Sequence, residues 1–171
     1  MTTNDGTITE LRAIDGSLIG TYPVGSVSLG VAFDGTNIWV TNSDNNTVVK
    51  VNASNGSVIG TYGVGHSPRN IASDGANIWV TSDSDGTVTK LKASDGSLVG
   101  TYSAASYGIA FDGVNIWVAG NSGSGIVTKL RASDGSLVGT YATVVDLHTA
   151  IAFDGVNIWV ANWGNNTVSK F

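Results

Sequence analysis

The chain has 171 residues with 23 glycines, only two prolines and a charged fraction of 12%, a composition that favours short β-strands joined by tight turns over helices. Its net charge is −5 and its eight basic residues are scattered singly, which excludes nucleic acid and anionic membranes as expected partners. It contains no cysteine, which excludes disulfides, thiolate nucleophiles and thiolate metal ligands.

The first residues, MTTNDGTITE, contain neither a basic region nor an apolar run, so they do not have the pattern of a signal peptide. No uncharged apolar stretch approaches the ~20 residues that a membrane span requires. We therefore expect a soluble protein, and the sequence does not indicate its compartment.

An internal repeat decides the architecture, because a fixed period of a few tens of residues is typical of repeat folds. The string NIWV occurs four times, at intervals of 40, 38 and 42 residues, and contains Trp39, Trp79, Trp117 and Trp159. The string GTY also occurs four times and ends at Tyr22, Tyr62, Tyr102 and Tyr141.

Each repeat predicts four short strands. In the third repeat we expect strands at 107–111, 115–119, 126–132 and 136–141. The first pair is joined by an Asp-Gly turn at 112–113 and the last pair by one at 134–135. Such turns supply the positive φ angles of tight hairpins, so every repeat predicts an up-and-down antiparallel meander.

A single four-stranded sheet of about 40 residues cannot bury both of its faces, so such units pack against one another. The period, the strand count and the recurrent tryptophan favour an all-β fold of the β-propeller type, with four blades in one domain spanning residues 1–171. A β-solenoid is the structural alternative, but its coils are usually shorter and lack regular hairpin turns.

The phrase GIAFDGVNIWVAG, followed by VTKLRASDGSLVGTY, resembles the bacterial propeller repeats of the NHL, YVTN and streptogramin-lyase-like group. The resemblance implies that the IAFDG segment is the innermost strand of a blade and that GSLVGTY is the outermost. It implies little about function, because propellers host many unrelated activities. The near-identity of the repeats is typical of recent amplification or of an excised or engineered fragment.

The two ends of the chain both match a third strand, in residues 3–13 and 165–171. The sequence thus holds five third strands but four of each other kind. A ring could close by pairing the N-terminal third and fourth strands with the C-terminal first and second strands, which would displace either 7–13 or 167–171. The alternatives are a four-bladed monomer and an eight-bladed head-to-tail dimer, and we favour the homodimer.

Candidate binding residues lie where the repeats differ. The Asp-Gly and Asn-Gly turns barely vary, whereas the connections between repeats and the loops between second and third strands differ strongly. Strand alternation places these variable segments together on one face, around the channel mouth. The candidate ligand-binding residues on this variable face are His66, Arg69, Tyr107, Asp146, His148 and Trp163.

These residues have different expected roles. Arg69 and Tyr107 occupy the same position in their repeats, so they are expected to point together into the mouth and to hold an anion or a sugar ring. His66 and His148 are either acid–base or ligand-binding residues or ordinary loop residues. Trp163 is either a stacking platform or a packed lid over the rim. The segment SDSDGT at 82–87 is expected to be a hairpin, because no glutamate follows at position twelve of a calcium loop.

The function we favour is a non-catalytic propeller scaffold or binding module that self-assembles by completing split blades between chains. It would have no catalytic residue, cofactor or metal, and its ligand would be a small molecule or a sugar. The resemblance implies an alternative, a streptogramin-lyase-like enzyme with a histidine acid–base and a divalent metal at the mouth. His66 and His148 are its candidate histidines.

Overall fold

The computed structural model describes residues 5–120, 125–143 and 148–171. These residues form short antiparallel strands and a single turn of 3-10 helix. Three four-stranded sheets, which we name blades 1, 2 and 3, lie between a two-stranded N-terminal sheet and a three-stranded C-terminal sheet.

The strands follow one another in chain order. The N-terminal sheet contains β1 (Thr7–Leu11) and β2 (Leu18–Pro23). Blade 1 contains β3 (Ser28–Phe33), β4 (Asn37–Asn42), β5 (Thr47–Asn52) and β6 (Val58–Gly63). Blade 2 contains β7 (Pro68–Ser73), β8 (Asn77–Ser82), β9 (Thr87–Lys92) and β10 (Leu98–Ser103). Blade 3 contains β11 (Gly108–Phe111), β12 (Asn115–Ala119), β13 (Ile126–Arg131) and β14 (Leu137–Ala142). The C-terminal sheet contains β15 (His148–Phe153), β16 (Ile158–Asn162), the 3-10 turn η1 (Trp163–Asn165) and β17 (Thr167–Lys170).

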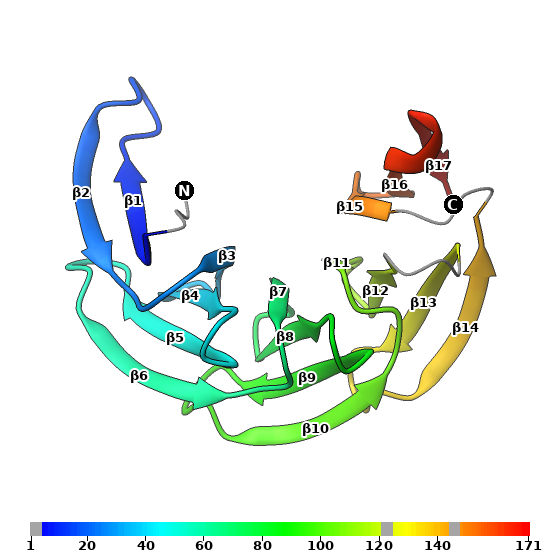
Figure 1. The fold of residues 1–171 in the computed structure, drawn as a ribbon, viewed down its shortest axis with the longest axis horizontal. Coiled ribbons are helices and arrows are strands. Elements are labelled where there is room, and N and C mark those ends of the chain that lie inside the picture. Colours follow the sequence, from blue (N-terminus) through cyan, green and yellow to red (C-terminus); the bar gives the residue numbers. More distant parts are fainter. Residues whose placement is uncertain (1–4, 121–124, 144–147) are drawn as a thin grey trace.

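The sheets stand side by side around a common centre and form an open arc (Figure 1). The first strands β3, β7, β11 and β15 lie on the inside of the arc and contact one another in that order. The fourth strands β6, β10 and β14 lie on the outside (Figure 1). The N-terminal and C-terminal sheets face each other across the gap.

A recurring aspartate fixes the turn between the first two strands and the tryptophan beside it. In blade 1 the Asp34 carboxylate accepts hydrogen bonds from the backbone N–H groups of Thr36 (2.8 Å) and Asn37 (2.7 Å). It also accepts one from Trp39 Nε1 at 2.7 Å. Gly35, inside this turn, has a φ of 97°, which suits a residue without a Cβ. The aspartate thus orients the indole ring through contacts within its own blade.

The core lies between neighbouring blades. Trp39 of blade 1 is fully buried and belongs to one apolar cluster with Ile78 and Leu91 of blade 2. The ring of Tyr62 lies 5.4 Å from the Trp39 ring, measured between centroids. Blades 2 and 3 repeat this arrangement around Trp79. Trp39 and Trp79 are therefore each covered by the second and third strands of the next blade, which is why an isolated sheet would leave them exposed.

The strands predicted from the third repeat are confirmed to within one residue at each end, and 82–87 forms the hairpin between β8 and β9. The single chain is not a closed ring in the described residues. Strand β1 pairs with β2 and β17 pairs with β16, and no pairing joins the two terminal sheets. The two terminal sheets of the described residues have two and three strands, because each terminal third strand pairs within its own sheet.

Candidate functional site

The variable connections and the variable loops meet on one face, as predicted. The backbone N–H of Ser67, in the connection into blade 2, donates to Asn46 Oδ1 in a blade 1 loop at 3.0 Å. Ser84 Oγ, in the loop between β8 and β9, donates to Ser67 Oγ at 2.8 Å. The turns that barely vary between repeats lie together at a different place. The N–H of Ala93, in the turn after β9, donates to the carbonyl of Ala76, in the turn after β7, at 2.9 Å.

Arg69 and Tyr107 come together on this face, one from blade 2 and the other from the residue before β11. The Arg69 Cζ atom lies 4.8 Å from the centroid of the Tyr107 ring, and Arg69 Nη1 lies 3.5 Å from the phenolic oxygen. Arg69 Nε donates to Asp83 Oδ2 at 2.9 Å. The predicted juxtaposition is therefore present, with Asp83 as a third member that the sequence did not indicate.

The backbone of Tyr107 is held by blade 2, which makes this cluster rigid. Asn70 Nδ2 donates to the Tyr107 carbonyl at 2.9 Å, and Thr81 Oγ1 donates to the same oxygen at 3.0 Å. The ring is half-buried and so is Arg69. A guanidinium stacked on a fixed phenol ring offers N–H donors in one plane, a geometry that suits a carboxylate or a pair of sugar hydroxyls.

His66 lies at the rim of the same face and pairs with Asp85. Its Nδ1 atom lies 2.8 Å from Asp85 Oδ1, and its side chain is 72% exposed. The backbone N–H of His66, which donates to Asp85 Oδ2 at 2.7 Å, and the imidazole itself lower the pKa of Asp85. A hollow of about 500 Å³ adjoins Asp83 and Asp85, between the loops of blades 2 and 3.

His148 and Trp163 belong to the C-terminal end of the arc. Trp163 opens η1 and is 68% exposed. His148 is the first residue of β15 and stands opposite Asn162 in the strand register. Asp146 lies outside the described residues. Their roles in ligand binding stay predictions.

Among the side chains that the structure describes, in residues 5–120, 125–143 and 150–171, no three of histidine, aspartate or glutamate come close enough to hold a metal ion. No helix in those same segments has the length and apolar character that crossing a membrane would need.

No protein-family model matches the sequence, and no curated protein matches it. Solved structures do resemble the fold. The computationally designed Ika4 protein has a TM-score of 0.75 at 16% identity, covering 91% of this chain and 94% of that one. The computationally designed Ika8 protein has a TM-score of 0.80 at 16% identity, covering 99% of this chain and 54% of that one.

Two natural assemblies are also similar. A chain of a mitotic checkpoint complex has a TM-score of 0.81 at 15% identity, and the match covers 98% of this chain and 56% of that one. A hydrazine synthase chain from Kuenenia stuttgartiensis has a TM-score of 0.74 at 20% identity, with 91% and 49% covered. This protein has a β-propeller-like repeat architecture. It spans about half the length of three of these four chains, and at such identities the likeness shows the fold alone.

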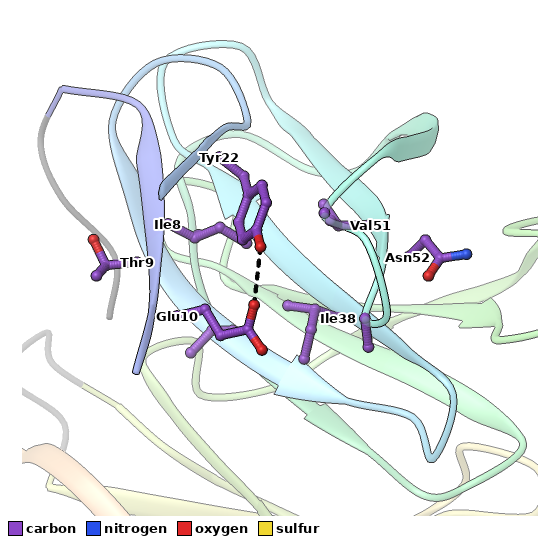
Figure 2. A pocket seen from close by; sticks show the side chains of 10 residues that line it. Ile8, Thr9, Glu10, Tyr22, Ile38, Val51 and Asn52 are labelled. Atoms are coloured by element: carbon purple, nitrogen blue, oxygen red, sulfur yellow. Dashed lines mark hydrogen bonds between the residues drawn. The ribbon is translucent and has the colours of Figure 1, made fainter. Parts of the chain in front are cut away.

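A second site lies away from the variable face of this propeller-like arc, between the N-terminal sheet and blade 1 (Figure 2). It is a pocket of about 220 Å³ lined by Ile8, Thr9, Glu10, Tyr22, Val31, Ile38, Val51, Asn52, Ala53 and Gly56. On one wall the hydroxyl of Tyr22 donates to Glu10 Oε2 at 3.0 Å. This pocket was not predicted from the sequence, because its walls come from residues of two different repeats.

Proposed function

We propose that this chain is a non-catalytic propeller scaffold that assembles with a second copy by completing the split blade and presents the variable face for binding. The observation that carries the proposal is the complementarity of the two ends. The N-terminal sheet consists of third and fourth strands, whereas the C-terminal sheet consists of first, second and third strands. Together the two sheets hold all four strands of a blade, with the third strand present twice.

The open ends also carry apolar side chains that the complete blades bury. Trp159, in the C-terminal sheet, is 39% exposed, whereas Trp39 and Trp79 are fully buried. Val168 of β17 is 60% exposed, whereas its counterpart Val48 in β5 is fully buried. Exposed apolar faces beside unpaired strand edges favour association, and a head-to-tail contact that closes into a ring limits that association to a defined oligomer.

The solution mass tests the assembly directly. We expect size-exclusion chromatography with light scattering to give twice the chain mass of 17.5 kDa. Because apolar packing and strand pairing would hold the dimer, raising the salt concentration should leave that mass unchanged. A mass of 17.5 kDa across a concentration series would contradict assembly.

The binding role of the variable face rests on the stacked Arg69 and Tyr107. We expect a thermal shift with at least one member of a panel of monosaccharides, carboxylates and inorganic anions. The substitutions Arg69→Ala and Tyr107→Ala should abolish that shift. Arg131→Ala is the matched control, because Arg131 is an exposed arginine of blade 3 that pairs with Asp134. A thermal shift that persists in the Arg69→Ala variant would contradict ligand binding at this site.

One observation favours a second candidate, a lyase-like activity at the same face. Asp85 fixes the orientation of the His66 imidazole through Nδ1, which leaves Nε2 for proton transfer, and such pairing is typical of acid–base histidines. The test is turnover of a streptogramin-type macrocycle with an added divalent metal. Activity that is lost in His66→Ala would support this candidate, and no turnover in the unmodified chain would reject it.

A further inference from the structure

The pocket beside the N-terminal sheet corresponds to the site that holds a tryptophan between complete blades. Between blades 1 and 2, Trp39 lies in one cluster with Ile71, Ile78, Leu91 and Ala93 and is flanked by Tyr62. The residues at the same repeat positions are Val31, Ile38, Val51 and Ala53 of blade 1 and Tyr22 of β2, and all five line the pocket. The described residues that line this pocket include no tryptophan.

The walls of this pocket already have the geometry of the complete interfaces. The Tyr22 ring packs on Gly56 as closely as the Tyr62 ring packs on Gly96. What differs is exposure, since Val31 is 48% exposed while its counterpart Ile71 is 8% exposed. The pocket therefore has the walls of a complete interface. It lacks the one side chain that buries the equivalent residues between blades 1 and 2.

Trp159 has the conformation that such a site accepts. Its Nε1 atom donates to Asp154 Oδ2 at 2.6 Å, in the same way as Trp39 donates to Asp34. Lys170 Nζ lies 5.2 Å from the Trp159 ring centroid, the same distance as Lys50 Nζ from the Trp39 ring. The ring is thus oriented as in a complete blade, but no following blade covers it.

Completing the blade requires a choice between two third strands, β1 and β17. Keeping β17 replaces the β1–β2 pairing with a β17–β2 pairing, and keeping β1 replaces the β16–β17 pairing with a β16–β1 pairing. Each strand is also tethered to its own neighbour by a short hairpin. The two arrangements therefore have similar backbone pairing and similar chain connections. Their difference in free energy comes from the side chains of β1 and β17.

The deciding position holds Lys170 in β17 and Glu10 in β1. In blade 1 the equivalent Lys50 donates from Nζ to the carbonyls of Ala93 (2.7 Å) and Ser94 (3.0 Å) in blade 2. The equivalent carbonyls at the pocket belong to Ala53 and Ser54. An ammonium group suits both these oxygens and the face of an indole ring, whereas a carboxylate is repelled by both.

Strand β17 is also anchored where β1 is not. The backbone of Phe171, next to the end of β17, exchanges two hydrogen bonds with Ile158, and its ring lies 6.1 Å from that of Tyr141 in blade 3. Leu11, the corresponding residue of β1, is exposed. Displacing β17 would break the ring contact with Tyr141 of blade 3. Displacing β1 would remove Ile8 from its apolar cluster and break the hydrogen bond from Tyr22 to Glu10.

We infer that β15, β16 and β17 of one copy combine with β2 of a second copy into a complete blade, that Trp159 fills the pocket, and that β1 is displaced. This inference rests on the proposed assembly and adds its occupant and its strand order. Lys170 then donates to the carbonyls of Ala53 and Ser54 of the second copy. Val168 takes the place of Ile8.

Two pairs of variants test the inference by the dissociation constant of the dimer. Deleting residues 1–12 should leave the dimer intact or tighten it, whereas deleting 167–171 should weaken it. Trp159→Ala should weaken it by about thirtyfold or more, the effect of truncating a central interface aromatic. Trp163→Ala is the matched control, because that ring is exposed on η1, and it should have no effect.

Hydrogen exchange of the unmodified chain gives a test that does not depend on the variants folding. On assembly, amides of β17 should exchange more slowly and amides of β1 faster. A dimer in which β1 gains protection, or which needs 1–12 but not 167–171, overturns the strand order while leaving the assembly itself intact. A monomeric mass for the unmodified chain overturns the assembly, and this inference with it.

Discussion

A buried lysine between blades offers a sharp test of how the repeats hold together. Lys90 is almost fully buried, and its Nζ donates to the carbonyls of Ala132 (2.7 Å) and Ser133 (3.1 Å) in blade 3. The same atom lies 4.8 Å from the Trp79 ring centroid. Lys90→Met keeps the apolar stem and removes the charge and both hydrogen bonds, so it isolates the contribution of the ammonium group.

The magnitude follows from the two hydrogen bonds. A hydrogen bond from a charged donor contributes about 1.5–3 kcal/mol to stability, with the desolvation of the donor already included. We therefore expect Lys90→Met to lower the free energy of unfolding by about 3–6 kcal/mol.

Lys129 provides the matched control in blade 3. Its Nζ lies 4.5 Å from the Trp117 ring centroid, but within the described residues it does not form carbonyl hydrogen bonds like those of Lys90. Lys129→Met should cost only about 0.5–1 kcal/mol, the contribution of a partly exposed cation–π contact. Urea unfolding followed by circular dichroism measures both variants. Equal losses would refute the assignment of the stability to the carbonyl hydrogen bonds.

Two further predictions concern the turns. Gly96 and Gly113 both have positive φ angles, of 74° and 95°, but an added Cβ at Gly96 would overlap the Tyr62 ring whereas Gly113 faces open space. Gly96→Ala should therefore cost about 2–4 kcal/mol and Gly113→Ala about 1 kcal/mol in urea unfolding, and similar costs would contradict the packing argument. For Asp34 and Asp112, burial acts to raise the pKa, but hydrogen bonds from the indole and from backbone N–H groups outweigh it and lower the pKa overall. Because the folded-state pKa lies below the unfolded one, the urea midpoint should hold from pH 7 to about 5 and fall below about pH 4, and a midpoint that stays flat to pH 2 would contradict this.

The repeat pattern predicted the strands because their signals are local. Alternation, Asp-Gly turns and the period of about 40 residues each depend on neighbouring residues, so strands such as Asn115–Ala119 were predicted with their observed bounds. The placement of Arg69 beside Tyr107 was also predictable, since equivalent positions of adjacent repeats lie together in any radial packing. Asp83 was not predictable as their partner, because its loop differs from every other copy.

The sequence by itself determined the four-stranded repeat, the variable face and the mismatch between the two ends, since all three can be read from the alignment of each repeat with the next. Only the tertiary structure decided that the terminal sheets stay apart in one chain, that lysines such as Lys50 donate to carbonyls of the following blade, and that a pocket lies between β2 and blade 1. These features depend on how residues some 40 positions apart are placed between sheets. That placement is set by packing between blades, which no local pattern encodes.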